Sequence, residues 1–490
     1  MASVHLPVEM WCSAWEFLPI MECFNIAQVC RSWRRAACAW PRLWTQLSYK
    51  DYPASNADTE LPEDARLVIT EVQLLDLFAE RSAPMPLDVK SNVLRDCYGD
   101  ADQAQRLVKF SQLLARNASR LRSLFITIDS IGLARKILFS LPHSLPHLET
   151  LYIADGKRKR DKIELDFYTP ALKNLQLCGI RPSRVMFNVT APLLHHLTGW
   201  VNDARCARRL LSRAFAVQEL QVDVHSNFHP TDAETQLIRR NLPPWLDTLK
   251  LECRGNNGTT HEYALSNFYD AAIRNCTLFL TALGDGHLQG FLADVTQPSD
   301  IWCLPRGELE EQYMVRGNDK MRTIRLDKAF SRWDQPFLCN LWAQLAPCAA
   351  HTVVKLAVHS QLLRKVMPHI PCENAIQELR FYFDAGTHSE SFAAFDAQLE
   401  WMLEDEDYNV SLPQLRVVML CIDRSHPELE RPIIWNRKST ELAARLSKML
   451  DLGGERPLQR LELRELRFKG EDPAATSCPW QSLAHEVLYT

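Results

Sequence analysis

The sequence lacks the features by which secreted, membrane-spanning and zinc-binding proteins are usually recognised. None of its 15 cysteines stands in a C-x-x-C pair, and their odd number does not fit a disulfide framework. Residues 1–20 have neither the basic start nor the continuous apolar core of a signal peptide, and no window of 18 residues is entirely apolar. We therefore expect reduced cysteines and a location in the cytoplasm, the nucleus or both.

Neither sign of charge dominates. The 56 Lys and Arg residues and the 60 Asp and Glu residues leave a formal net charge of -4, so the chain has neither the basic footprint of a nucleic-acid-binding protein nor an acidic tail. We expect neither nucleic acid nor a membrane among its partners. With 490 residues, 46% of them hydrophobic, the chain is long enough for several domains or one long repeat array.

Motifs of catalysis are also missing: there is no P-loop, no G-x-S-x-G elbow and no H-E-x-x-H zinc motif. The stretch GDGHLQG, residues 284–290, is one residue longer than a dinucleotide-binding loop, and a turn between a strand and a helix explains it better. The neighbouring His195 and His196 would point to opposite sides of a strand and could not share one metal ion. We expect no catalytic residue, no cofactor and no metal; only residues 284–290 motivate the alternative of an enzyme.

Tryptophan, in contrast, is concentrated at the start of the chain, where five of the 13 tryptophans lie within residues 6–44. Three short helices are predicted in this stretch, over residues 7–17, 21–28 and 31–39, because prolines begin or end them. A unit this small buries too little apolar surface to be stable alone. Part of its apolar surface should therefore be covered by another domain or protein.

Four short motifs follow one another in this stretch. They are Leu6-Pro7-x-Glu9, Leu18-Pro19, Val29-Cys30-Arg31-x-Trp33-Arg34 and Leu43-Trp44. In this order and at these separations they resemble the F-box. The resemblance implies docking on the adaptor subunit of an SCF-type cullin–RING ubiquitin ligase and, through the adaptor, on the cullin. The residues that it implies at or behind this interface are Leu6, Pro7, Glu9, Leu18, Val29 and Trp33. The alternative is an ordinary helical cap on a larger domain.

Two positions depart from the F-box pattern. Ala14 stands where a larger aliphatic residue is usual in the first helix, and Cys23 stands where leucine is usual in the second. Each change removes methylene groups from the expected contact, at about 0.8 kcal/mol per buried CH₂. These departures keep open the alternative of a scaffold that binds partners without ubiquitination.

Behind this segment, residues 49–66 are polar and rich in turn formers, and they predict a linker. Residues 71–90 then predict a helix, with Val72, Leu75 and Phe78 at helical spacing, followed by a short strand. The order of helix, Arg-Ser pair and strand is similar to the segment behind the F-box in many fungal F-box proteins.

One pattern, apolar-x-x-apolar-x-apolar, recurs from residue 118 onward. It begins at Leu121, Leu148, Leu172, Val217, Leu246, Met321, Val353, Ile376, Leu415 and Leu458, with a partial match at Leu194. In five of these eleven places a proline stands two residues earlier, more often than chance allows for 27 prolines in 490 residues. Proline ends a preceding helix and needs no partner for a backbone N–H before a strand. Spacings of 22 to 29 residues up to Leu246 predict a strand–helix repeat of leucine-rich type.

The predicted fold class is α/β, with a small all-α F-box followed by an irregular leucine-rich-repeat solenoid of parallel strands and helices. The predicted domains are the F-box at 4–48, a linker and first helix–strand segment at 49–117, and degenerate repeats at 118–490. Spacing is irregular after residue 246, which predicts cryptic repeats and surface excursions. The cryptic repeats fall near 277–283 and 291–295, and the excursions near 255–265, 296–318 and 384–411.

Residues that alternate with the buried positions of the strands would line one open face of a stacked array. The candidates for binding a target protein on this face are Tyr152, Lys250, Arg325, Arg380, Tyr382, Arg460 and Arg464. Arginine and tyrosine are common interface anchors, and the arginines favour an acidic or phosphorylated partner; solubility alone is the alternative. The sequence thus predicts a non-catalytic substrate-recognition subunit of a ubiquitin ligase that binds an unknown target protein.

Overall fold

The computed structural model describes the N-terminal helices and most of the strands. The described residues are 7–51, 71–93, 101–128, 137–155, 163–178, 185–187, 190–212, 216–254, 260–280, 289–292, 294–295, 298–306, 310–317, 319–327, 355–359, 362, 366, 376–384, 410–423, 433–435, 440, 443–444, 446–447, 450–451, 457–464, 466–468 and 479–489. The chain divides into two compact units, Met1–Leu246 and Asp247–Thr490. Within the described ranges, no helix has the length and hydropathy needed to cross a bilayer.

The N-terminal stretch forms short helices at the places that its prolines predict. The elements are α1 (Val8–Trp15), α2 (Ile20–Val29), α3 (Arg31–Cys38) and the 3₁₀ helix η1 (Pro41–Trp44). Pro7 and Pro19 stand just before α1 and α2, and the Pro7 carbonyl oxygen accepts a hydrogen bond from Met10 N at 3.1 Å. Proline suits a helix start because the N–H that it lacks would have no helical partner there.

These helices enclose a small core that continues into the next helix, α4 (Glu71–Arg81). Cys23 and Ala37 are almost completely buried. Trp44 is fully buried, its Nε1 donates a hydrogen bond to Ala37 O at 2.8 Å, and its ring stacks on Phe78 of α4 with 5.4 Å between centroids. One of the N-terminal tryptophans therefore joins the three helices to the rest of the first unit.

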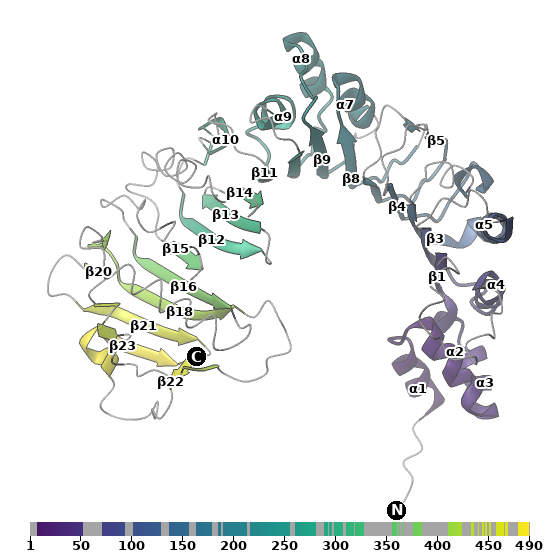
Figure 1. The fold of residues 1–490 in the computed structure, drawn as a ribbon, viewed down its shortest axis with the longest axis horizontal. Helices are drawn as coiled ribbons and strands as arrows, with labels where there is room; N and C mark the ends of the chain where they lie inside the picture. The colour runs from purple at the N-terminus through teal and green to yellow at the C-terminus, as the bar shows by residue number, and fades with distance from the viewer. Residues whose placement is uncertain are drawn as a thin grey trace, which may run out of the picture. The chain divides into compact units, whose positions relative to one another are not determined.

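The first unit contains a sheet in which strands that follow one another in sequence are also neighbours in space. Its strands are β1 (Gln46–Asp51), β2 (Leu87–Val93), β3 (Leu121–Ile128), β4 (Thr150–Asp155), β6 (Asn174–Cys178), β8 (His196–Val201) and β9 (Glu219–His225). Each pairs in parallel with the next. Figure 1 shows helices α4, α5 (Ala101–Arg116), α7 (Ala204–Leu211) and α8 (Asp232–Arg240) on one side of these strands.

The start of this sheet lies where the sequence predicts the end of one domain and a linker. Residues 49–51 were assigned to the linker, but they complete β1 and pair with β2. Leu47 and Tyr49 are both buried, at the spacing of two that one face of a strand requires. The polar neighbours of Tyr49 concealed this short alternation. The remainder of the predicted linker, residues 52–66, lies outside the described residues.

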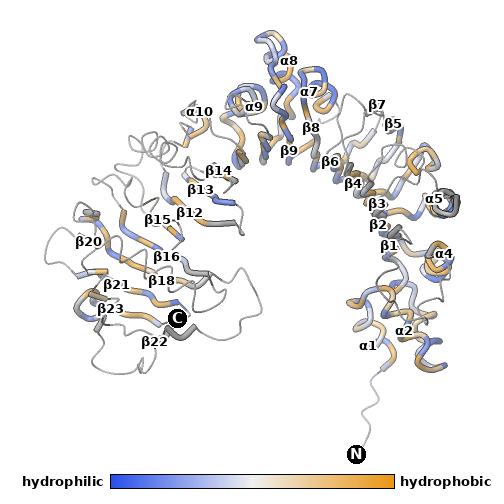
Figure 2. The backbone as a smooth tube through the Cα atoms, in the orientation of Figure 1, coloured by the Kyte–Doolittle hydropathy of each residue, from blue (hydrophilic) through white to orange (hydrophobic). Residues whose placement is uncertain are grey.

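The recurring apolar pattern correctly predicts which strand side chains are buried. In β3, Leu124 and Ile126 are fully buried, and in β21 (Leu458–Arg464) of the second unit Leu461 and Leu463 are fully buried as well. Apolar stretches run through the strands of both units in Figure 2. The alternation of the strand therefore sets the buried face in each of these repeats.

The prolines before the strands occupy turns rather than the ends of helices. Leu172 N donates a hydrogen bond to Thr169 O at 3.1 Å across Pro170. The same bond closes the turns that end at Leu148, Leu194, Leu246 and Leu415, each with proline in the second position. The second position of such a turn needs φ of about −65°, which the proline ring imposes. Turn geometry thus explains the excess of proline.

The repeat at β8 matches the pattern only partly because its third apolar position is Gly199. A Cβ atom on Gly199 would meet Leu210 Cδ1 of α7 at 2.4 Å. Leu210 therefore fills the place that a larger strand residue fills next door, where Val222 is the register partner of Gly199. Glycine here allows the helix to approach the strand closely.

Two of the connections in the first unit contain strands where helices were predicted. β5 (Ile163–Leu165) follows β4, β7 (Val185–Phe187) follows β6, and the two pair in parallel with each other. Helices return after β8, where α8 begins with a capping box between Thr231 and Glu234. The described repeats are therefore mixed, and only some of them are strand–helix units.

The second unit holds a sheet of mostly parallel strands. In spatial order they are β10 (Thr248–Arg254), β11 (Asn275–Leu280), β14 (Lys320–Asp327), β13 (Glu310–Gly317), β12 (Asp300–Arg306), β15 (Lys355–His359), β16 (Glu378–Asp384), β18 (Val417–Asp423), β21 and β23 (Ala484–Tyr489). β13 is antiparallel to both neighbours. Helices α9 (Thr260–Phe268) and α10 (Gln289–Leu292) precede and follow β11, and further short pairs join β17 (Val410–Ser411) to β20 (Leu450–Asp451) and β19 (Ile433–Trp435) to β22 (Leu466–Phe468).

Between β11 and β14, the structure differs from two predictions; β12 and β13 there form an antiparallel insertion. The stretch 296–318 was predicted as a surface excursion, but it contributes β12 and β13, whose inner residues include the buried Ile301 and Tyr313. The cryptic repeat predicted near 291–295 has α10 and a turn at this place, in which Val295 N donates to Leu292 O at 3.0 Å. Of the other two predicted excursions, residues 260–265 lie in α9, and 385–409 lie outside the described residues.

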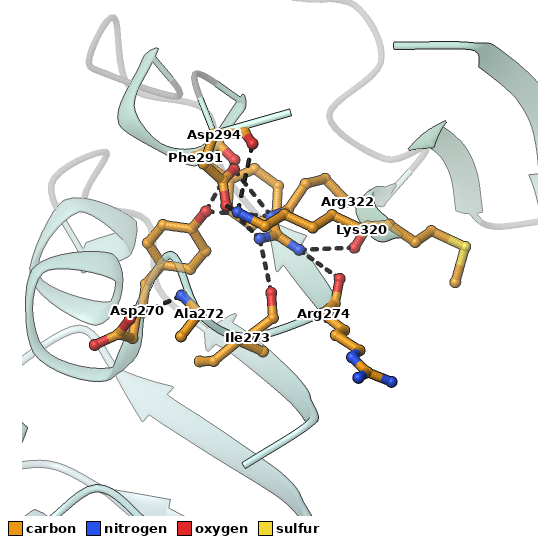
Figure 3. Close-up of polar contacts among 10 residues, drawn as sticks. Asp270, Ala272, Ile273, Arg274, Phe291, Asp294, Lys320 and Arg322 are labelled. Carbon is orange, nitrogen blue, oxygen red and sulfur yellow. Dashed lines mark hydrogen bonds and ion pairs between the residues drawn. The ribbon is translucent and has the colours of Figure 1, made fainter. Parts of the chain in front are cut away.

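A buried arginine of β14 fastens this strand to the turn before β11 (Figure 3). Arg322 of β14 is fully buried, its Nη1 donates to Arg274 O at 2.7 Å, and its Nη2 donates to Ile273 O at 2.8 Å. Asp294 accepts a further hydrogen bond from Nη2 at 2.5 Å. Burial disfavours the charged guanidinium, but hydrogen bonds to Asp294 and Tyr269 outweigh it and raise the pKa of Arg322.

Candidate functional site

The N-terminal helices expose an unusual number of large apolar side chains. Thirteen such side chains are exposed in the described part of the chain, and seven of them lie between residues 8 and 29. These seven, called here the apolar F-box residues, are Val8, Met10, Trp11, Phe17, Leu18, Met21 and Val29. Phe17 is 90% exposed and Val29 is 65% exposed. Exposed apolar side chains at this density are typical of surfaces that bind another molecule.

A cluster of tryptophans holds α1 against α3. The Trp33 ring lies 5.4 Å from the Trp15 ring and 6.2 Å from the Trp11 ring, measured between centroids. The Trp33 backbone N–H donates to Cys30 Sγ at 3.4 Å, so Cys30 caps α3. Trp40 Nε1 donates to Glu16 Oε1 at 2.6 Å. The tryptophans thus position the helices that carry the apolar F-box residues.

The structure separates the predicted adaptor-binding residues into two groups. Pro7, Glu9, Leu18 and Val29 are exposed. Trp33 is half-buried under Trp11 and Trp15, so it supports the surface more than it forms it. Leu6, the sixth predicted residue, lies outside the described residues. Sequence reasoning did not single out Phe17 or Met21 for this surface, because neither belongs to the motifs.

The two departures from the F-box pattern lie in different environments. Ala14 is exposed on α1. Cys23 is 1% exposed, and its Sγ donates a hydrogen bond to Trp15 O at 3.4 Å. A shorter side chain at position 23 therefore changes the packing of α2 on α1, inside the domain, rather than a contact with a partner. Burial also raises the pKa of the Cys23 thiol.

The predicted target-binding residues lie on the strand faces opposite the buried apolar positions, in both units. In the first unit, Tyr152 packs against Phe125 of the neighbouring strand with 5.8 Å between ring centroids. Burial, and then the nearby Cys178, raise the pKa of the Tyr152 hydroxyl. In the second unit Lys250 is exposed and Tyr382 is half-buried.

The predicted arginines of the second unit each lie beside a carboxylate. Arg464 Nη2 lies 2.8 Å from Glu462 Oε2, and Arg460 Nε lies 2.9 Å from Glu462 Oε1. Arg380 pairs with Glu378 in the same way, two residues along one strand face. The sequence contains this spacing as E-x-R and R-x-E-x-R. In a strand it places the opposite charges side by side on one face, a signal that the sequence-based prediction did not use.

Arg325 differs because its partner comes from another strand. Its guanidinium bonds to Glu310 of β13, within the stretch predicted as an excursion, and it lies over the Phe279 ring at 5.0 Å. No sequence signal places Glu310 there, because the pairing depends on the antiparallel insertion. The strand face of the second unit therefore carries alternating, already paired charges rather than a positive patch.

The comparison with protein families bears on the N-terminal helices alone. The model of the F-box domain matches residues 4–44, which covers α1, α2, α3 and η1. A search of curated proteins found no match. F-box domains generally bind the adaptor within SCF complexes. The domain match and the helices joined by Trp33 together support an F-box protein, with its F-box domain at residues 4–44.

Proposed function

We propose that this protein is the substrate-recognition subunit of an SCF-type cullin–RING E3 ubiquitin ligase, an F-box protein of the fungal type with degenerate leucine-rich repeats. The F-box domain docks on the adaptor, which joins the chain to the cullin, and the strand faces bind one target protein. The subunit carries no catalytic residue. It acts by raising the effective concentration of target lysines near the ubiquitin-charged enzyme.

The observation that carries this proposal is the F-box match at residues 4–44 together with the exposed apolar F-box residues. Phe17, Leu18 and Val29 are large apolar side chains that the fold leaves exposed. When a partner covers an apolar surface of this kind, the removal of that surface from water favours binding. The consecutive parallel strands behind it supply a long, regular face on which a target can lie.

The paired arginines shape the kind of target recognition that we propose. A carboxylate or phosphate on the target would share Arg464 or Arg380 with Glu462 or Glu378, so each contact adds little net affinity. Paired charges instead penalise partners whose charges do not match. Recognition on this face should therefore depend on several matched contacts, with tyrosines such as Tyr382 contributing apolar area.

The test is a pull-down of the full chain with a purified adaptor–cullin pair. Val29→Asp places a charge among the apolar F-box residues, and Val108→Asp is the matched control because Val108 is 51% exposed on α5, outside the F-box. The double substitution Leu6→Ala/Pro7→Ala tests the first motif. We expect binding by the intact chain and by Val108→Asp, and loss of binding in the other two variants.

Two outcomes would contradict the proposal. If the intact chain captures neither adaptor nor cullin, a repeat scaffold that acts without ubiquitination describes the protein better. If all variants bind equally, the F-box residues named here do not form the interface. Circular dichroism of each variant distinguishes lost contact from lost folding.

A further inference from the structure

A cavity of about 750 Å³ lies in the first unit, where α2 and α4 meet the first strands of the sheet. Its lining comes from the residues that begin α2, from α4, and from β1, β2, β3 and the start of β4. The volume falls within the range of about 300–1,000 Å³ that small-molecule sites occupy. The lining residues all belong to the first unit, and the cavity shares Met21 with the apolar F-box residues and Phe125 with the strand face of the first unit.

One side of the cavity is apolar. Ile20 and Met21 of α2, Leu74 and Phe78 of α4, and Phe125 of β3 contribute to the lining. Phe78 is held in place by its stacking on the buried Trp44 ring. This side therefore offers an apolar body a preformed surface, and removing such a body from water is favourable.

The other side is polar, and both of its carboxylates are already neutralised. Asp88 accepts hydrogen bonds from Arg122 Nε at 3.0 Å and from Ser123 Oγ at 2.5 Å. Glu149 pairs with Lys173 Nζ at 3.1 Å. Neither carboxylate needs a further cation, so neither attracts a positively charged ligand strongly.

Lys90 of β2 supplies the charge that remains. It lines the cavity, it is exposed, and it has no carboxylate partner among the residues that the structure describes. Its register neighbours on either side are Ser48 and Phe125, which are uncharged. The cavity thus combines an apolar body site with one unmatched positive charge.

We propose that this cavity binds a small amphipathic carboxylate, with its apolar body against α2 and α4 and its carboxylate on Lys90. A single anionic head group matches the single unpaired ammonium group, and charge-assisted hydrogen bonds of this kind are the stronger ones. This inference goes beyond the proposed function, because it rests on the lining of the cavity and on Lys90, and not on the F-box match.

The test uses decanoate as the probe, titrated by calorimetry into the full chain. Decyltrimethylammonium, whose alkyl chain is one carbon longer and whose head group carries the opposite charge, is the head-group control. We expect saturable binding of decanoate at one site and no comparable binding of the cation. Lys90→Gln should weaken decanoate binding by roughly tenfold, a factor that corresponds to about 1.4 kcal/mol. Lys109→Gln, at an exposed lysine of α5 outside the cavity, should leave binding unchanged.

A second variant locates the apolar body. Leu74→Trp adds bulk from α4 into the cavity and should abolish decanoate binding while the melting temperature of the ligand-free chain stays close to that of the parent. The proposal is overturned if the intact chain does not bind decanoate, if it binds the cation equally well, or if Lys90→Gln and Leu74→Trp both bind as the parent does. Binding that persists in both variants would place decanoate elsewhere, for example on the apolar F-box residues.

Discussion

In the F-box, apolar side chains such as Phe17 and Val29 stand in solvent, whereas the open strand face of the second unit carries arginines that each lie beside a carboxylate. None of the thirteen exposed large apolar side chains belongs to the described part of the second unit. The F-box thus keeps apolar surface that no described part of the chain covers. In the second unit, by contrast, the four predicted arginines have carboxylate partners within the chain.

Under the proposed function, the two surfaces suit different kinds of partner. Apolar burial is non-directional and stabilises association in proportion to area, which suits one partner that is always the same. Charge pairs that already exist add little net affinity, but they penalise mismatched partners, which suits a surface that must discriminate. The following experiments separate these two kinds of surface by their effects on stability.

The largest effect is expected at the buried charge of the second unit. Arg322→Met removes one of the two cationic partners of Asp294, which keeps Lys320 Nζ at 3.2 Å. It also removes the side-chain donor to Ile273 O and one of the two donors to Arg274 O, which still accepts from Met321 N. We expect the second unit to lose about 3–5 kcal/mol of unfolding free energy, the usual cost of breaking a buried ion pair. Denaturant unfolding measures the loss, and the exposed Arg316→Met is the control. A loss as small as that of the control would contradict a structural function for Arg322.

The next effect separates the interior of the F-box from its surface. Trp44→Ala empties a fully buried site and should cost about 3–5 kcal/mol. Trp33→Ala should cost less, about 2 kcal/mol, because Trp33 is half-buried and loses mainly its ring contacts. Thermal and denaturant unfolding of the two variants provides the comparison. Equal costs would mean that Trp33 is as deeply packed as Trp44.

A smaller effect is expected from the cysteines. Cys30 and Cys38 of the F-box are exposed, whereas Cys253, Cys276 and Cys303 of the second unit are buried. Burial raises the pKa of Cys276 to about 12, so almost no reactive thiolate forms there at neutral pH. In native protein, iodoacetamide should label Cys30 and Cys38 and spare the three buried thiols, as peptide mass spectrometry can determine.

The same thiols give the stability of the second unit a pH dependence with a definite sign. The folded state keeps Cys276 protonated above 9.0, the ordinary thiol pKa, whereas the unfolded chain releases the proton. The stabilisation is therefore present below pH 9.0 and declines as the pH rises towards about 12. Denaturant titrations at increasing pH test this, with Cys276→Ala as the variant that should reduce the decline.

The smallest effect is expected on the strand face. Arg380→Gln leaves Glu378 with Lys355, whose Nζ lies 3.7 Å from the carboxylate, so the loss of stability should be about 0.5–1 kcal/mol. Double-mutant cycles with Glu378→Gln measure the coupling directly. A coupling of several kcal/mol would mean that these pairs hold the fold together and are not available to a partner.

Much of the fold could be predicted because its determinants are local. Leu124 and Ile126 are buried because a strand alternates, and Pro170 lies at a turn because its ring imposes the required φ. The F-box motifs could be found for the same reason, since their residues lie within one short stretch. The predicted site was less complete: Phe17 and Met21 are exposed, but no motif contains them.

The sequence by itself determined the helices around the N-terminal prolines, the strands of the recurring pattern and the F-box motifs, which were predicted to span 4–48 and which the family model matches at 4–44. Only the tertiary structure decided that Leu210 fills the space beside Gly199, that Glu310 meets Arg325, and that Lys90 lines a cavity without a carboxylate partner among the described residues. The physical reason is range. Alternation and turn geometry act over a few residues, whereas these contacts join separate elements whose register is set only when the strands and helices pack.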